Sequence, residues 1–464
     1  MLKLGLWSIL SLLALTGCSV GPDFHPPEPA LPSLWQSAAE SGDGPTANWW
    51  QGFGMADLSE LMQRAQQANP DLGAAVARVR QADAQAKIAG AALLPSLQAN
   101  AGPSRSRGLA TIPKSGNRPE GLNSFGLSVT MSYELDFWGR AADLQDIALS
   151  MALASRFDQQ TAALGVEAGV VNAYFSLLAL RQRVEIATKA VANAEAVLVA
   201  LRARSGEGLA TEQEITQQEA LLADQRALLL PLQQQQREWR NSLAILTGQQ
   251  PEGMAEPGGH LAEILFPAVK SGLPAALLAH RPDIQAAQAQ LQAANADIKA
   301  AWAATLPDVV VTAQGGLQSH RLGALLDPAS VAYSLAASIT QPLFSGGILE
   351  GGLELKQARY DELLELYRKA VLAALVDVEN ALAAVSLGQE QETARQNAAT
   401  SARHSLQAAQ AQLQMGLVDR LAVLTAERNL YQTEDLLAQA RLNHGQALVG
   451  LFRALGGGWQ AEAQ

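Results

Sequence analysis

Apolar and polar side chains alternate strictly along residues 125–137. A period of two is the pattern of a β-strand with two different faces. The run is long for a strand of a soluble domain and has aromatic residues near its ends, which favours lipid on one face and water on the other. A soluble β-sandwich strand also alternates, so that alternative stays open at this point. One face carries Phe125, Leu127, Val129, Met131, Tyr133, Leu135 and Phe137, and the other carries Gly126, Ser128, Thr130, Ser132, Glu134 and Asp136.

Three further runs alternate in the same way and complete two hairpins. Residues 97–101 precede the first run and are joined to it by a basic loop, and residues 309–318 and 333–340 form a second pair. We therefore expect β-hairpins at about 95–137 and 307–343. A sheet in a bilayer must close, and about eight strands is the practical minimum for closure. Membrane-embedded strands would require several chains to share one barrel.

Long helices are predicted between the hairpins, because residues 141–230 and 343–464 contain no proline. The first of these stretches keeps a heptad seam, which indicates left-handed coiled-coil packing. The seam after Ile348 is poorer, with Glu392 and Arg395 at seam positions. It suits either a mobile or water-facing element or a solvated coiled coil with imperfect heptads. The first seam consists of Val170, Leu177, Val184, Val191 and Leu198, with Ala173, Leu180, Ala187, Ala194 and Leu201 beside them.

The second half of the chain repeats the first. Pro95 recurs as Pro307 at a separation of 212 residues, and Gly208-Leu209 recurs as Gly416-Leu417 at a separation of 208. Matched helix breakers and turns indicate a tandem duplication. We expect a first repeat over 49–247 with a helical turn at about 205–211, a linker over 248–273, a second repeat over 274–456 with its turn at about 414–419, and a tail over 457–464.

The N-terminus has the pattern of an export signal. Residues 1–17 combine Lys3 with an apolar run that is too short to span a bilayer. Cys18 is the only cysteine, which excludes an intramolecular disulfide and a thiolate metal cluster. Leu-Thr-Gly-Cys resembles the bacterial lipobox, which implies diacylglycerol and palmitate on Cys18, and Ser19 in place of aspartate implies sorting to the outer membrane. Residues 18–48 are predicted to form an extended tether.

Several motifs together resemble the TolC-type outer-membrane efflux factors, in their lipoprotein branch. They are residues 15–18 with 20–24, the runs 133–140, 280–284 and 341–347, and the two Gly-Leu turns. The resemblance implies a mainly α fold with membrane β-structure: a homotrimer with one twelve-stranded barrel and a hollow periplasmic cylinder of coiled-coil helices. It also implies two partners, a periplasmic membrane-fusion adaptor and an inner-membrane RND-type transporter.

The resemblance also assigns candidate site residues. In the family, aspartates and an arginine after the second turn close the channel through contacts between protomers. Arg428 matches the arginine, whereas Ala422 and Thr425 stand at the usual aspartate positions. We expect Asp419, Arg420 and Glu427 to substitute in the gate, although each could be an ordinary exposed helix charge. The expected adaptor-docking residues are Gly208, Leu209, Ala210, Thr211, Gly416, Leu417 and Val418.

No enzymatic chemistry is indicated by the sequence. The six histidines form no pair at metal-ligand spacing, and no phosphate loop or nucleophile elbow occurs. A net charge of -11 argues against a nucleic-acid partner. We therefore predict a passive efflux channel without a cofactor, apart from the lipid. The alternatives are an exit channel for protein secretion and a periplasmic coiled-coil spacer lipoprotein without a pore.

Overall fold

The computed structural model describes residues 20–29, 31–36, 47–106, 122–269, 272 and 274–457. The predicted signal, the lipidation residue Cys18 and most of the first hairpin loop lie outside these residues. The chain divides into two compact units. One consists of Met1–Pro27, Val79–Ser155 and Ala287–Tyr367, and the other of Glu28–Arg78, Arg156–Ala286 and Arg368–Gln464.

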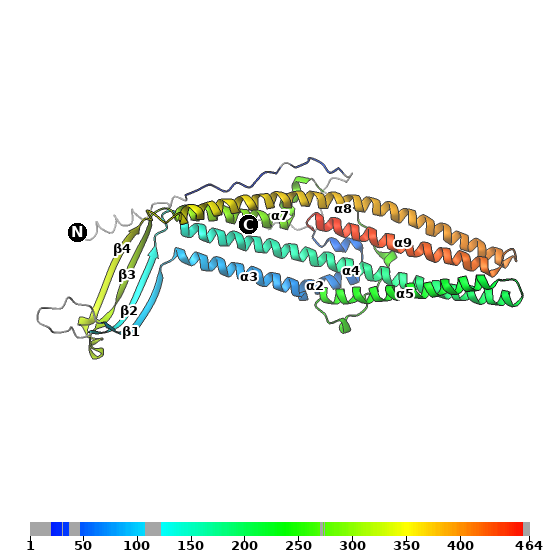
Figure 1. Cartoon of the computed structure of the whole chain (residues 1–464), viewed down its shortest axis with the longest axis horizontal. Helices are drawn as coiled ribbons and strands as arrows, with labels where there is room; N and C mark the ends of the chain where they lie inside the picture. The colour runs from blue at the N-terminus through cyan, green and yellow to red at the C-terminus, as the bar shows by residue number, and fades with distance from the viewer. Residues whose placement is uncertain are drawn as a thin grey trace. The chain divides into compact units, whose positions relative to one another are not determined.

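The first unit contains a single antiparallel sheet of four strands (Figure 1). The strands are β1 (Ser96–Ser106), β2 (Leu122–Glu134), β3 (Asp308–Ser319) and β4 (Val331–Thr340), in that spatial order. Successive side chains of a strand point to opposite faces of the sheet. The register places apolar residues opposite apolar ones and polar residues opposite polar ones across the four strands. Leu97, Met131, Ala313 and Leu335 stand opposite one another in turn, as do Gln98, Thr130, Gln314 and Ser334.

The apolar face and both edges of this sheet are uncovered. Tyr333 of β4 is 88% exposed, and β1 and β4 are exposed along their whole lengths. The opposite face carries serine, glycine and glutamine around a hollow of about 370 Å³. A sheet with a bare apolar face, a polar hollow and two unpaired edges is incomplete in water.

Matched proline breaks begin the helices that precede the strands. Helix α2 (Ala56–Ala68) ends before Asn69, whose side-chain oxygen accepts from the Asp71 and Leu72 amides at 2.8 and 3.0 Å. This caps α3 (Pro70–Gly90), which has proline at its first position. Helix α7 (Pro282–Ala303) also has proline at its first position, after the short α6 (Leu277–His280), but there Oδ1 of Asp283 accepts from the Ile284 amide at 3.0 Å.

Asp136 does not continue the polar face of β2, as the alternation had predicted. The strand ends at Glu134, and the two Asp136 oxygens accept from the Ala141 and Ala142 amides at 3.1 and 2.9 Å. A carboxylate there satisfies the unpaired amides at the start of α4 (Arg140–Gly206). Asp136 is therefore a helix cap.

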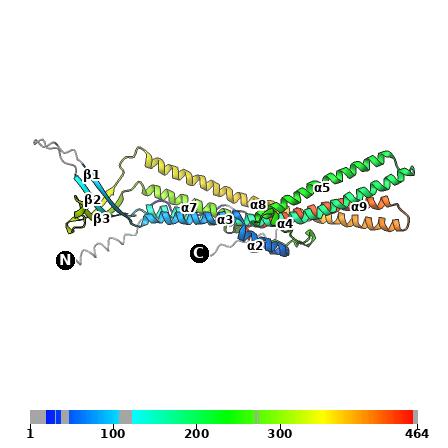
Figure 2. The ribbon, with the colours of Figure 1, turned by 90° about the horizontal axis from the view of Figure 1, so that it is seen from below.

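Two helical hairpins carry the coiled-coil sequences (Figure 2). One joins α4 to α5 (Glu212–Leu246), and the other joins α8 (Ile348–Gln414) to α9 (Arg420–Ala454). The heptad positions Val170 and Leu177 are buried, as the seam predicted. In the poorer seam, the Glu392 carboxylate pairs with Arg441 of α9 at 3.0 Å and with His444 at 2.7 Å. That seam position is filled by an ion pair with Arg441 and a hydrogen bond with His444 instead of apolar packing.

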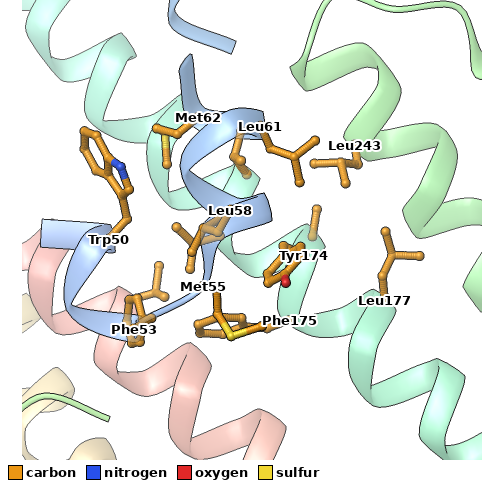
Figure 3. Close-up of a cluster of buried hydrophobic side chains, with 14 of the residues drawn as sticks. Trp50, Phe53, Met55, Leu58, Leu61, Met62, Tyr174, Phe175, Leu177 and Leu243 are labelled. Carbon is orange, nitrogen blue, oxygen red and sulfur yellow. The ribbon is translucent and has the colours of Figure 1, made fainter. Parts of the chain in front are cut away.

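The core of the second unit joins both copies of the repeat (Figure 3). The 3₁₀ turn η1 (Trp49–Phe53) and α2 pack on α4, and Trp49 stacks on Phe452 of α9 with ring centroids 4.8 Å apart. The Tyr174 hydroxyl donates to the Gly258 carbonyl at 3.0 Å, and burial raises the pKa of Tyr174 to about 12. Large aromatic contacts therefore fix the linker and the two copies together.

Candidate gate and docking turns

The two helical hairpins reverse through turns of the same geometry. Gly208 has φ +75° and Gly416 has φ +71°, a left-handed conformation that favours glycine. The amide of Leu209 donates to the Arg204 carbonyl at 2.8 Å, and that of Leu417 donates to the Gln412 carbonyl at 2.9 Å. These six-to-one bonds are the Schellman ending of a helix. The duplication has therefore kept both turns.

A leucine is exposed at the end of each turn. Leu209 is 63% exposed and Leu417 is 70% exposed. In a Schellman ending this position often packs back on its own helix. Here the two side chains stay in water, where apolar surface has a free-energy cost unless a partner covers it.

Helix caps fix the chain directly after each turn. Thr211 accepts from the Glu214 amide at 3.2 Å, and Glu214 accepts from the Thr211 amide at 2.7 Å. This capping box lowers the pKa of Glu214 through hydrogen bonds from the Thr211 backbone and hydroxyl. In the second copy Asp419 takes the place of Thr211, and its Oδ1 accepts from the Ala422 amide at 3.0 Å.

An ion pair joins the two turns. Nη1 of Arg204, near the end of α4, lies 2.7 Å from Oδ2 of Asp419. Asp419 was expected at the gate and lies between the turns, whereas Arg204 was not among the predicted residues. Both side chains are partly exposed, so salt screens this contact.

The other expected gate residues differ in their surroundings. Glu427 accepts from Nδ2 of Asn193 at 2.9 Å, and the same amide donates to the Leu424 carbonyl at 3.1 Å. Arg420 and Arg428 are exposed, and neither forms an ion pair with any residue that the structure describes. Of the four expected gate residues, the two acidic ones, Asp419 and Glu427, therefore have partners within the chain. The two arginines, Arg420 and Arg428, face solvent.

Arg428 borders a cavity of about 720 Å³ between α4, α5 and α9. Asn193 and Tyr431 line the cavity, as does Arg183, which pairs with Asp435 at 2.7 Å. The aspartate-equivalent position Thr425 lines it as well, with its hydroxyl bonded to the Leu421 carbonyl of its own helix at 2.9 Å. Polar and apolar side chains together line this cavity.

The sequence motif around Arg281 has a structural role. Arg281 is buried and contacts Asp283 at 2.6 Å, Asp377 of α8 at 3.2 Å and the Ala454 carbonyl at 3.1 Å. Burial acts to lower the pKa of Arg281, but its bonds with the two carboxylates outweigh burial and raise it. This arginine ties α7, α8 and α9 together.

No group of three or more histidine, cysteine, aspartate or glutamate side chains that could hold a metal ion occurs among the described residues. The expectation of a covalent lipid concerns Cys18, which lies outside them. The tether is described from Val20, and the Pro22 carbonyl accepts from Asn295 of α7 at 3.0 Å. Further along, Trp35 Nε1 donates to the Gly272 carbonyl at 3.0 Å.

Comparison with known proteins identifies the family. The family model described as "Outer membrane efflux protein" matches residues 61–249 and 273–457. The chain belongs to the outer membrane efflux protein family. It is 38% identical to the pyoverdine export outer membrane protein OpmQ of Pseudomonas aeruginosa, over 98% of this chain and 97% of that protein. It is 31% identical to outer membrane protein OprJ of the same species, over 98% and 96% of the two chains.

Solved structures share the fold over nearly the whole chain. The outer-membrane channel OprN matches with a TM-score of 0.86 at 27% identity, covering 96% of this chain and all of that one. The open state of the MtrE channel of Neisseria gonorrhoeae matches with a TM-score of 0.83 at 28% identity, with coverage of 96% and 100%. The predicted fold class, outer-membrane location and efflux-channel function are confirmed. A spacer without a pore is excluded.

Proposed function

We propose that three copies of this chain form the exit duct of a tripartite pump, closed at the helical turns until a periplasmic adaptor engages them. The observation that carries the proposal is the unfinished sheet, with a bare apolar face and two unpaired edges. Three four-stranded sheets make the twelve strands of a closed barrel, which removes every edge. An inner-membrane RND-type transporter would supply the energy.

Exposed apolar residues on α8 support an oligomer. The helix leaves several large side chains in water, which neighbouring protomers would cover. They are Leu355, Leu366, Leu372 and Val376.

The turns support a docking role. Leu209 and Leu417 offer two equivalent apolar contacts at the ends of hairpins whose backbones are fixed by glycine and by caps. An adaptor with apolar pockets at matching spacing would bury both. The residues that would make this contact are Gly208, Leu209, Ala210, Thr211, Gly416, Leu417 and Val418.

The gate would use charges near the same turns. Arg420 and Arg428 are exposed cations, and Asp419 and Glu427 are the acidic groups beside them. Ala422 and Thr425 cannot supply the carboxylates that the family resemblance implies. In the trimer Arg428 would therefore meet a different acceptor, and the Arg204–Asp419 pair would hold the two hairpins of one chain together.

The names of two relatives support a proposal for the substrate class. OpmQ is named for pyoverdine export, and TtgF of Pseudomonas putida, 30% identical over 97% of this chain and 96% of that protein, is named for toluene efflux. Both cargoes are small organic molecules. We propose small toxic or secreted organic compounds as the substrates here, in preference to proteins.

The lipid on Cys18 would hold the tether at the inner leaflet of the outer membrane.

Conductance of the purified channel in planar bilayers tests the gate. Arg428→Ala should raise the open probability of the channel. Cells that carry this leaky variant should become more sensitive to drugs. Arg237→Ala on α5 is the matched control, because Arg237 is also exposed and forms no ion pair with the described residues. Unchanged conductance and unchanged drug susceptibility in Arg428→Ala would refute the gate. A monomeric mass by light scattering in detergent would refute the trimer.

A further inference from the structure

The duplication relates the two β-hairpins residue by residue. In the first hairpin Ser96 stands opposite Ser132, and in the second Asp308 stands opposite Thr340. Ser96 precedes Asp308 by 212 positions, and Ser132 precedes Thr340 by 208, which are the separations found from the sequence. The two hairpins therefore have the same register, with no slip between copies.

The structure also shows how one copy pairs with the next. Strand β2 ends the first hairpin, and it pairs with β3, which begins the second. In this contact Ser132 stands opposite Thr312, and Thr130 stands opposite Gln314. A junction between successive copies is thus present within one chain.

The pairing of β2 with β3 predicts how the two free edges of the sheet, β4 and β1, pair between subunits. Strand β4 ends the second copy and β1 begins the first, so in a closed barrel β4 meets β1 of the partner subunit. The counterpart of Ser132 is Thr340, and the counterpart of Thr312 is Asn100. We infer that β4 pairs antiparallel with β1 of the partner subunit, with Thr340 opposite Asn100 and Ser338 opposite Gly102. This inference rests on the proposed trimer and fixes its register.

The inferred register keeps the two faces of the barrel continuous. It places Ile339 opposite Ala101, both on the apolar face, and the polar Thr340 opposite the polar Asn100. A slip of one residue would put Ile339 opposite Asn100 and reverse the faces. A slip of two residues keeps the faces, so only an experiment on the register can separate it from the inferred pairing.

The junction within the chain also gives the type of pair. The Leu135 amide donates to the Val309 carbonyl at 2.8 Å, which makes this odd-numbered pair a hydrogen-bonded one. Leu343 is the counterpart of Leu135, and it is 93% exposed, as expected of a residue whose partner strand belongs to another chain. The even-numbered pairs on the polar face are then non-hydrogen-bonded, with Cα atoms about 4.5 Å apart. That separation falls within the range that a disulfide bridges.

Cysteine cross-linking of the full-length channel in outer membranes tests the register. The double variant Asn100→Cys with Thr340→Cys should give disulfide-linked dimers and trimers on a non-reducing gel. Two displaced pairs on the same face are the controls: Gln98→Cys with Thr340→Cys, and Gly102→Cys with Thr340→Cys. We expect at least a tenfold lower cross-linking yield from both, and none from Thr340→Cys alone.

The outcomes separate the register from the trimer. A displaced pair that cross-links as well as or better than Asn100 with Thr340 would overturn the register while supporting the oligomer. A trimeric mass without a cross-link at any pair would overturn the pairing of β4 with β1. A monomeric mass of the unmodified protein would instead overturn the proposed trimer. A second in-register pair, Gly102→Cys with Ser338→Cys, should cross-link as well as Asn100→Cys with Thr340→Cys.

Discussion

Arg204 donates to Asp419 at 2.7 Å, although the two residues lie 215 positions apart in the chain. The contact links the turn of one copy of the repeat to the turn of the other. In the proposed gate, the two hairpins would separate at this contact when the channel opens. Its partial exposure limits its strength to about 1 kcal/mol or less.

Loss of this ion pair should favour the open channel. Arg204→Gln is expected to raise the open probability by up to about fivefold at low salt, because up to about 1 kcal/mol of closed-state stabilisation is removed. The wild type should approach the variant at high salt, where the contact is screened. Single-channel recording measures both.

Arg202→Gln is the matched control for this variant. Arg202 forms an equally short pair with Glu219 at 2.7 Å, but within one hairpin. Its loss should leave gating unchanged. Equal effects of Arg202→Gln and Arg204→Gln would argue that general charge, and not the contact between turns, controls opening.

Polar substitution of the two exposed leucines should abolish adaptor docking without unfolding the channel. Leu209→Ser with Leu417→Ser removes apolar surface that is already in water, so the thermal midpoint should stay within about 1 °C. Drug resistance in a deletion strain should fall to the level of the empty vector. Val199→Ser, on an exposed flank of α4, is the control and should retain resistance.

Asp143 should make stability depend on pH. It is 4% exposed, its Oδ2 lacks a hydrogen-bond partner, and burial raises its pKa from 3.8 to about 6. Nearby Lys299 lowers this pKa, and Asp146 and Asp136 raise it. Since the folded state binds the proton more tightly, stability from this group is full below about pH 4 and is lost as pH rises through about 6.

Asp143→Asn should remove this dependence. The variant should be more stable than the wild type above pH 6, by up to about 3 kcal/mol for a shift of about two units, and the two should converge toward pH 4. Thermal midpoints in detergent between pH 4 and 8 measure the difference. Asp224 on α5 is exposed and is not among the groups that shift the pKa of Asp143, so it serves as the control: Asp224→Asn should follow the wild-type profile.

Arg281 should stabilise the second unit. Arg281→Met leaves the Asp283 and Asp377 carboxylates without their shared cation, but these carboxylates are 40% and 55% exposed, so the cost should stay below the about 3–5 kcal/mol of a fully buried pair. The thermal midpoint should fall by more than in an exposed-pair variant. Arg226→Met breaks the exposed pair with Glu195 and should cost about 1 kcal/mol or less, as shown by the thermal midpoint.

The strands and helices of this chain could be predicted from the sequence, because the apolar residues of each face recur at short intervals along the chain. Val170 and Leu177 are buried as their heptad positions required, and Leu97 and Met131 share one sheet face as their alternation required. These features depend on neighbours along the chain. They also repeat in the second copy, which doubles the signal.

Contacts between distant segments could not be predicted in this way. Glu392 looked like a defect in a heptad seam until its partners Arg441 and His444 became visible on the other arm of the hairpin. Asp136 fitted the alternation of β2 and instead caps α4, because the strand ends two residues earlier. Arg204 and Asn193 carry no motif, and only the pairing of hairpins brings them to Asp419 and Glu427.

Pro231 lies inside α5, whereas the matching position in α9 is Gln439, whose side chain bonds to Asp435. Proline has no amide to donate, so α5 lacks one bond of its helical ladder at a point where α9 keeps its own. The two hairpins, although of common origin, therefore differ in stiffness. Helix α5 can bend more readily at Pro231 than α9 can at Gln439.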